Sequence, residues 1–503
     1  MPRTVEAVLI VALCFLTRVP SLFEPLAMDQ SLFAVIARGL LRGERLYADL
    51  WDHKPPGIYL LYAAAIRLFG SGAWSIAFAS IAAQCTTSLL VRAIVRRYAS
   101  DRTALLSGVL YAVIANPILL GGFYATGQAE VFIEPLVLGA ILFVAAASPR
   151  AVVLSGVAFG AAVALKPTAL LFAGLIAAMP RLLRDGAACE TAASISQRTR
   201  LRRFFAGALV APLLSFVYIV ATGTLAPAVD ALAGWNAASL RAGGASALME
   251  GLSPHPFAIL ALLFDGILHL GPFLIFSALG LVPPRARGLL LAWLGVAILT
   301  VIVQGKLYRY HYQFVLAPLM ALAAIGVAVL AQHARKVLAR AAAPVVAAGV
   351  VVSLIPFGAL VRDYWREHRD AFAPRHAAAD PDALASYTWS STGMRYADAA
   401  RVAEIVRAGS GPADRIYVLG FDPQVYLLAD RAPAGRYLAH DHIRYPGGET
   451  RLRDDLVRSN PRWVVVATDQ VGPRDFALVA EWIAAHTEPR GAVGRFALFE
   501  RVR

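Results

Sequence analysis

Residues 28–56 place an acid and a lysine in one polar stretch between two apolar runs. Asp29 stands near its start, and His53-Lys54-Pro55-Pro56 closes it. Carboxylates serve as general bases, and fixed ammonium groups stabilise negative charge that develops during a reaction. Each signal has a plainer structural interpretation when taken alone. Asp29 is equally suited to cap a helix, and Lys-Pro-Pro is a common way to start one. Their combination in one loop is the strongest indication of chemistry.

A second acidic group follows in the apolar sequence GGFYATGQAEVFIEP (121–135). Glu130 and Glu134 are one helical turn apart and therefore share a helix face. A carboxylate within an apolar segment is costly enough to be a functional candidate, although two glutamates at a helix mouth are also compatible with a hydrated interface. Lys166, Asp265 and His269 are weaker candidates at the ends of apolar runs.

These polar groups must be positioned by apolar segments, which dominate the chain. Hydrophobic residues make up 58% of the 503 residues and charged ones 16%, with a mean hydropathy of +0.61. A membrane helix needs about 20 apolar residues, and such runs predict about eleven crossings. They lie near 5–22, 73–91, 103–120, 129–147, 150–165, 167–180, 204–222, 265–282, 288–303, 313–331 and 341–361. Lys166-Pro167 divides the fifth run from the sixth.

Basic residues in the loops predict the orientation. With the N-terminus in the cytoplasm and eleven crossings, the arginine clusters at 92–97, 198–203 and 335–340 all lie inside, as the positive-inside rule requires. The loop at 28–70 and residues 362–503 then lie outside, in the periplasm. The net charge of +14 is therefore interpreted as topology information, and no motif indicates a nucleic-acid partner.

The chain after Val361 has the pattern of a soluble α/β domain. Helical periodicity at 397–408 and 476–486 alternates with buried-strand patterns at 415–419 and 462–467, and 496–502 predicts a final strand. The predicted fold is thus a polytopic α-helical membrane domain (1–361), with interfacial helices in its first periplasmic loop, followed by a soluble periplasmic α/β domain (362–503). The three cysteines provide no disulfide framework.

The first loop resembles that of GT-C membrane glycosyltransferases of the protein O-mannosyltransferase and lipid A aminoarabinose transferase family. The matching residues are Asp29, the stretch from Ala37-Arg38 to Tyr47 and Asp49, and Lys54-Pro55-Pro56. Gln30 departs from the Asp-Glu pair of many relatives. Looser similarities occur at 121–135, 165–171, 306–318 and 415–437.

The resemblance implies an inverting glycosyltransferase that takes its sugar from a polyprenyl-phosphate carrier. Asp29 is the implied general base and Glu130 an assisting or orienting acid. Lys54 is the first candidate for the carrier phosphate, followed by Arg309, His311 and Tyr312. A divalent metal is not required by the motifs, but Asp29, Glu130 and His53 could ligate one. His53 also fits an ordinary loop histidine.

Two other classes of function remain compatible with the sequence. The first is a transporter or flippase of lipid-linked sugars, although no internal repeat typical of transporters is visible. The second is a polymerase or ligase of surface polysaccharide. In each case the partners are the lipid bilayer and a lipid-linked sugar. For the transferase the acceptor would be a glycolipid such as lipopolysaccharide, a glycan or a protein, and the location a bacterial inner membrane.

Overall fold

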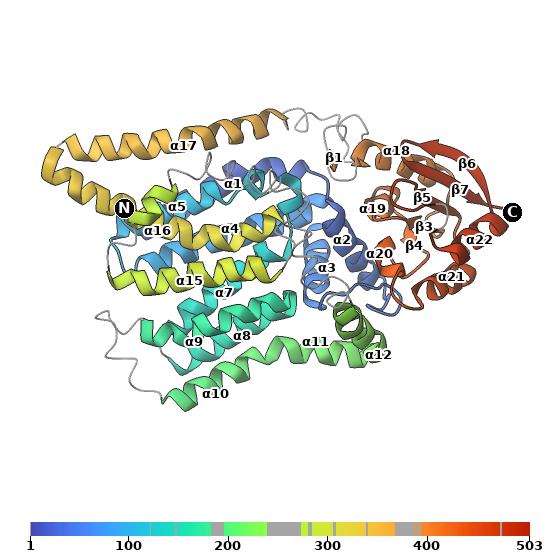
Figure 1. Cartoon of the computed structure of the whole chain (residues 1–503), viewed down its shortest axis with the longest axis horizontal. Coiled ribbons are helices and arrows are strands. Elements are labelled where there is room, and N and C mark those ends of the chain that lie inside the picture. Colours follow the sequence, from blue (N-terminus) through green and yellow to red (C-terminus); the bar gives the residue numbers. More distant parts are fainter. Residues whose placement is uncertain are drawn as a thin grey trace. The chain divides into compact units, whose positions relative to one another are not determined.

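A computed structural model (Figure 1) describes residues 2–120, 122–145, 148–182, 196–238, 273–279, 284–304, 308–338, 341–367, 388–389, 394–472 and 475–502. The chain forms two compact units that interleave along the sequence. The helical unit comprises Met1–Leu22, Ala77–Ser215 and Ala242–Glu367. The mixed unit comprises Phe23–Ile76, Phe216–Arg241 and His368–Arg503. The first polar loop thus belongs to the same compact unit as the C-terminal residues.

Helices lie at the predicted spans of the helical unit, except at 265–282, most of which lies outside the described residues. The first half of the unit contains α1 (Arg3–Arg18), α4 (Ala73–Val95), α5 (Asp101–Ile114), α6 (Pro117–Leu120), α7 (Ala129–Ala145), α8 (Pro149–Leu165) and α9 (Ala173–Leu182). The second half contains α10 (Gln197–Ala208), α11 (Val210–Ala221), α15 (Pro284–Val303), α16 (Gln313–Leu338) and α17 (Ala342–Glu367).

Four helical segments within the described residues are long and apolar enough to cross a membrane. They are Arg3–Phe23, Ala73–Val95, Gln197–Ala221 and Arg309–Leu338. The chain therefore has the character of a multi-span membrane protein, while the number of eleven crossings stays a prediction. The predicted break at Lys166-Pro167 is present, because α8 ends at Leu165 and Lys166 has an extended backbone before the short 3-10 helix Pro167–Phe172.

Glycines allow α8 and α10 to approach each other closely. A Cβ atom at Gly156 would lie 2.1 Å from the carbonyl oxygen of Phe204, and one at Gly160 would lie 2.2 Å from that of Ala208. Gly207 on α10 faces the carbonyl of Val153 in the same way. Small residues four apart permit this backbone contact between apolar helices.

In the mixed unit, the first loop folds into α2 (Met28–Leu41) and α3 (Gly57–Phe69). Leu32, Val35 and Ile36 on α2 are buried. The start of α2 is tied to the C-terminal residues, because Tyr396 donates a hydrogen bond of 2.9 Å from its hydroxyl to the carbonyl of Leu26. A second segment contributes α12 (Leu225–Val229) and a π-helical turn at Asp230–Trp235.

The C-terminal part of the mixed unit contains the predicted α/β fold. Its five-stranded sheet has the order β4-β3-β5-β7-β6, in which β3 is parallel to β4 and β5, and β7 is antiparallel to β5 and β6. The strands are β3 (Arg415–Leu419), β4 (Ala432–Pro433), β5 (Trp463–Ala467), β6 (Thr487–Val493) and β7 (Phe496–Arg501), and β1 (Thr388–Trp389) and β2 (Met394–Arg395) form a separate pair. The helices are α18 (Tyr396–Ala408), α19 (Gln424–Ala429), α20 (His440–Ile443), α21 (Gly448–Ser459) and α22 (Ala477–His486).

The strands predicted at 415–419, 462–467 and 496–502 and the helices predicted at 397–408 and 476–486 are all present, within one residue at each end. The sequence did not indicate β4, β6, α19 or α21. β6 is an edge strand with an internal Pro489 and mostly exposed side chains, so it lacks the apolar alternation that marks a strand. The boundary at residue 361 stays a prediction.

Candidate functional site

Asp29 lies in the first turn of α2, where its carboxylate is half-buried. Its expected place at the N-cap is wrong, because α2 begins at Met28 and its N-cap is Ala27, which makes no side-chain capping bond. Within the part of the chain that the structure describes, the Asp29 carboxylate has no hydrogen bond or ion pair. Its charge acts on His53 and on the tyrosines of α3, Tyr59 and Tyr62. A carboxylate without a protein partner is available to accept a proton.

Lys54 reaches the same face of α2. Its ammonium lies 4.9 Å above the ring of Phe33, and Phe33 is four residues after Asp29 and therefore on its helix face. Phe33 is held in place by edge-to-face contacts with Tyr59 and Tyr62. About a quarter of the Lys54 side chain is exposed, so it can still reach a ligand. The two residues singled out in the first loop are thus presented by adjacent elements.

Asp52, the buried acid that orients Lys54, was not predicted from the sequence as a site residue. Its Oδ2 atom lies 3.6 Å from the Lys54 Nζ atom and accepts a hydrogen bond of 2.6 Å from the hydroxyl of Tyr59. Its Oδ1 atom accepts one of 2.6 Å from the backbone N–H of His53. Asp52 is fully buried, so these bonds compensate the cost of its charge. An acid two residues before Lys-Pro-Pro was the available signal.

Two histidines surround Asp52, one of them from the C-terminal part of the mixed unit. His53 Nδ1 and His442 Nε2 lie 2.9 Å and 3.7 Å from Asp52 Oδ1. Burial raises the pKa of Asp52, but Lys54, His53 and His442 together outweigh burial and hold that pKa well below its usual value. Burial lowers the pKa of His53, and that of His442 to about 3. The His442 imidazole is therefore neutral at pH 7, and the Lys54 ammonium is a cation that faces Asp52.

The remaining residues of the matching motif support the backbone around Lys54. The hydroxyl of Tyr47 donates a hydrogen bond of 2.8 Å to the carbonyl of Lys54, and Tyr47 has a left-handed backbone with φ of 69°. Asp49 accepts hydrogen bonds from the backbone and the guanidinium of Arg45. Tyr47 and Asp49 thus shape the turn and do not themselves carry the candidate chemistry.

In the helical unit, Glu130 stands in the first turn of α7 as one member of a charged cluster. Its Oε1 atom accepts a hydrogen bond of 2.5 Å from the ammonium of Lys166 and lies 3.8 Å from His311 Nε2. Lys166 also donates to Gln304. The ammonium of Lys166 is thus bound to an acid and an amide. His311 joins Glu130, whereas Arg309 and Tyr312 are exposed.

Glu134, one turn further along α7, has a different environment. It accepts hydrogen bonds from the hydroxyl of Tyr111 and the amide of Gln313, the latter at 3.0 Å. Its partners are neutral, while Glu130 faces a cation. The two glutamates thus share a helix face as predicted, but Glu130 is paired with a cation and Glu134 with neutral groups.

The expected metal ligands do not group as the sequence suggested. Within the described residues, His53 is clustered with Asp52 and His442, and the cluster includes neither Asp29 nor Glu130. Glu130 is instead engaged by Lys166. Asp265 and His269 lie outside the described residues.

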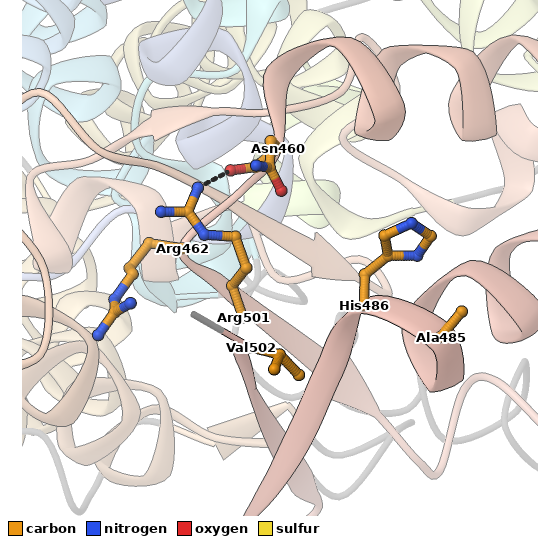
Figure 2. Close-up of a pocket in the computed structure, with 6 residues that line it drawn as sticks. All are labelled: Asn460, Arg462, Ala485, His486, Arg501 and Val502. Atoms are coloured by element: carbon orange, nitrogen blue, oxygen red, sulfur yellow. Dashed lines mark hydrogen bonds between the residues drawn. The ribbon is translucent and has the colours of Figure 1, made fainter.

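A pocket of about 430 Å³ occurs in the α/β part of the mixed unit (Figure 2). Arg501 and Arg462 line it with His486, and Arg501 donates a hydrogen bond of 2.8 Å to the carbonyl of Asn460. Arg462 is already paired with Glu500. No residue discussed above lines this pocket, and it contains no carboxylate, so it does not add to the candidate site.

Part of the chain matches a known protein family, and the whole fold is similar to solved membrane-protein structures. Residues 53–188 match the family model of dolichyl-phosphate-mannose-protein mannosyltransferases. Apo ArnT from Cupriavidus metallidurans is similar with a TM-score of 0.56 and 15% identity, covering 100% of this chain and 99% of ArnT. ArnT from the same organism bound to undecaprenyl phosphate is similar with a TM-score of 0.55 and 15% identity, and the match covers 99% of this chain and 98% of ArnT.

The archaeal oligosaccharyltransferase AglB from Archaeoglobus fulgidus, in complex with an inhibitory peptide and a dolichol-phosphate, is similar with a TM-score of 0.50 and 14% identity. The match covers 92% of this chain and 69% of AglB. A search of curated protein sequences gives no match. The matched family and these structural neighbours are glycosyltransferases, and the chain has the fold of the GT-C membrane glycosyltransferases that its first loop resembles.

Proposed function

We propose that this protein is an inverting glycosyltransferase that moves a sugar from a polyprenyl-phosphate carrier to an acceptor hydroxyl group. The proposed location is the periplasmic face of a bacterial inner membrane. The relatives with this fold are compatible with such a donor, because ArnT binds undecaprenyl phosphate and AglB binds a dolichol-phosphate. The acceptor would be a glycolipid, a glycan or a protein.

The observation that carries the proposal is the arrangement around α2. Within the described residues, the half-buried carboxylate of Asp29 in the first turn has no partner, and the Lys54 ammonium lies over Phe33 one turn further along the same face. Lys54 also falls within the residues that match the mannosyltransferase family model. A base and a cation on one helix face suit a reaction in which a hydroxyl loses a proton and a phosphate gains charge.

The proposed step is a direct displacement. The acceptor oxygen attacks the anomeric carbon and transfers its proton to Asp29. The bond between the anomeric carbon and the phosphate oxygen breaks, and its electron pair stays with that oxygen, which yields the polyprenyl monophosphate. Lys54 stabilises the negative charge gained by the phosphate. Attack opposite to the leaving group inverts the anomeric centre.

The cluster in the helical unit would contribute to the same reaction. Glu130, neutralised by Lys166, would orient the acceptor, and His311 together with Arg309 and Tyr312 would assist in holding the carrier phosphate. The assignment of these roles follows the family resemblance, and the ion pair between Glu130 and Lys166 supports it by keeping the carboxylate in one position.

The test separates the two central residues. Purified protein is assayed for undecaprenyl phosphate binding, and membranes supplied with labelled undecaprenyl-phosphate sugars are assayed for transfer, in Asp29→Asn, Lys54→Ala and the control Asp49→Asn. Asp29→Asn should bind the carrier normally and transfer at least 100-fold more slowly. Lys54→Ala should lose both carrier affinity and transfer.

The control Asp49→Asn removes a carboxylate of the same loop that is paired with Arg45, and it should retain activity. Full transfer by both Asp29→Asn and Lys54→Ala would refute the proposed site. Movement of intact labelled carrier across the membrane, with no glycosylated product, would instead establish a flippase and refute the transferase.

A further inference from the structure

The C-terminal part of the mixed unit contacts the first loop just before each of the two residues proposed for chemistry. Leu26 stands three residues before Asp29, and Trp51 stands three residues before Lys54. The backbone at each of these positions is bound by a group from the C-terminal part. Neither contact belongs to the reaction proposed above, but both lie where they control the position of its groups.

The first contact is made by Tyr396, at the start of α18. Its buried hydroxyl donates a hydrogen bond of 2.9 Å to the carbonyl of Leu26, 370 residues earlier in the chain. The tyrosine also packs with Met28 and Ala400 in a buried apolar cluster. Met28 is the first residue of α2 and directly precedes Asp29. Tyr396 thus holds the chain where α2 begins.

The start of α2 needs such a contact because it has no side-chain cap. Helix ends fray, and the N-cap residue Ala27 makes no side-chain capping bond. The carbonyl of Leu26 also accepts a hydrogen bond of 2.9 Å from the hydroxyl of Ser31, so loss of the Tyr396 hydroxyl alone leaves this carbonyl with a donor. A general base must stay within hydrogen-bond reach of the proton that it accepts. The contact from Tyr396 therefore matters most for the carboxylate of Asp29.

The second contact is a backbone hydrogen bond between Trp51 and the C-terminal part. The N–H group of Trp51 donates a bond of 2.9 Å to the carbonyl of Arg436. The rings of Trp51 and Tyr437 meet with their centroids 5.5 Å apart. Asp455 on α21 fixes Arg436, because its carboxylate accepts bonds of 2.8 Å from two nitrogens of the guanidinium and one of 3.1 Å from the backbone N–H. Asp455 thus helps to determine where the chain before Lys54 lies.

Two ion pairs connect the same segments but are less able to fix them. Arg38 lies 3.4 Å from Asp430, and Glu44 lies 2.8 Å from Arg415. One partner of each pair is exposed to solvent, and exposed ion pairs contribute little to stability. The two contacts described above therefore do most to hold the loop.

We propose that the C-terminal part positions the two groups of the proposed transferase site, with Tyr396 as the positioning residue for Asp29 and Asp455 as the positioning residue for Lys54. This inference rests on the proposed function for the chemistry that the two groups perform. Each positioning residue acts through the backbone of the first loop and not on the substrate. The two anchors are separate, so loss of one should impair one group and leave the other in place.

The experiment uses the full chain in detergent and compares Tyr396→Phe with Asp455→Asn. Tyr396→Phe should lower kcat for transfer from a labelled undecaprenyl-phosphate sugar about tenfold, because displacing a reacting group by about 1 Å costs about 100-fold. Its affinity for undecaprenyl phosphate should be unchanged, and hydrogen exchange should rise at residues 24–36. Asp455→Asn should instead weaken carrier binding about fivefold, which corresponds to the net strength of one hydrogen bond, and exchange should rise at residues 46–56.

Each variant has a matched control inside the α/β part. Tyr426→Phe also removes one buried hydroxyl, but that hydroxyl bonds to the backbone N–H of Val418 and not to the first loop. Glu500→Gln also removes one carboxylate from an ion pair, but its partner Arg462 stands directly before β5. Both controls should keep the wild-type kcat and carrier affinity.

Thermal unfolding should show that all four variants are folded. The proposal would be overturned if Tyr396→Phe and Asp455→Asn behave like their controls, or if the two change kcat, carrier affinity and exchange in the same way. A wild type that binds undecaprenyl phosphate but transfers no sugar would refute the proposed function. Exchange at the two segments would then still show whether each anchor holds its part of the loop.

Discussion

The Oδ2 atom of Asp52 lies 3.6 Å from the ammonium of Lys54, two residues later in the same loop. Asp52 therefore positions the Lys54 ammonium. It was not among the acids predicted from the sequence as site residues. The hydrogen bond from Tyr59 and the backbone N–H of His53 keep the carboxylate in place. The position of the Lys54 side chain therefore depends on a buried hydrogen-bond network that extends to Tyr59 on α3.

Asp52→Asn should weaken both this network and carrier binding. Removing one partner of a fully buried ion pair costs about 3–5 kcal/mol, and about 2–3 kcal/mol is expected here because Lys54 keeps contact with solvent. Hydrogen–deuterium exchange of residues 46–66 should show this loss, together with lower affinity for undecaprenyl phosphate. Asp49→Asn, which breaks an exposed pair with Arg45, should cost about 0–1 kcal/mol. Equal exchange in the two variants would contradict the prediction.

Glu130 and Lys166 should be energetically coupled. In a double-mutant cycle of Glu130→Gln and Lys166→Met, thermal unfolding should yield a coupling of about 1–3 kcal/mol, because the two groups form a hydrogen-bonded ion pair. Glu134→Gln is the control partner for Lys166→Met. Among the described residues, Glu134 accepts hydrogen bonds from the neutral groups of Tyr111 and Gln313, so this second cycle should be nearly additive. Additivity in both cycles would show that the ion pair has no energetic role.

The stability of the α/β part should decrease as the pH rises from 4 to 7. Burial raises the pKa of Asp422 to about 6, although Arg495 opposes this shift. Because the folded pKa lies above the unfolded value, the stabilisation is complete below pH 4 and is lost as the pH passes through 6. The contribution of this group is at most ~3 kcal/mol.

The measurement is hydrogen exchange of residues 415–419 in the full chain, corrected for the intrinsic pH dependence of exchange. Asp422→Asn has no titrating group at this position, so the corresponding part of the slope should disappear. An unchanged slope in the variant would assign the pH dependence to other groups.

The close contact of α8 with α10 should tolerate no side chain at Gly160. An added Cβ would lie 2.2 Å from the backbone oxygen of Ala208, so Gly160→Ala must move one helix and should cost about 1–3 kcal/mol. Gly174→Ala places the same methyl group where no atom lies within 4 Å. This control should be neutral or stabilising by up to about 1 kcal/mol. Thermal unfolding in detergent distinguishes the two variants.

The helices and strands were predictable because their signals are local. The apolar runs of α1 and α4 and the buried strand at 415–419 are visible as continuous or periodic patterns. The same holds for Lys54, whose motif is contiguous. Asp29 was identified as a candidate, but its expected position at the N-cap was wrong, because α2 starts one residue before it and the cap is Ala27.

The amino-acid sequence by itself thus determined the membrane character, the α/β part and the two residues proposed for catalysis, since these depend on composition and short-range spacing. Only the tertiary structure decided that Lys166 faces Glu130, that Trp235 stacks on His53, and that His442 approaches Asp52. These partners are far apart in the chain. Their meeting depends on which buried surfaces pack together, and no local pattern encodes that choice.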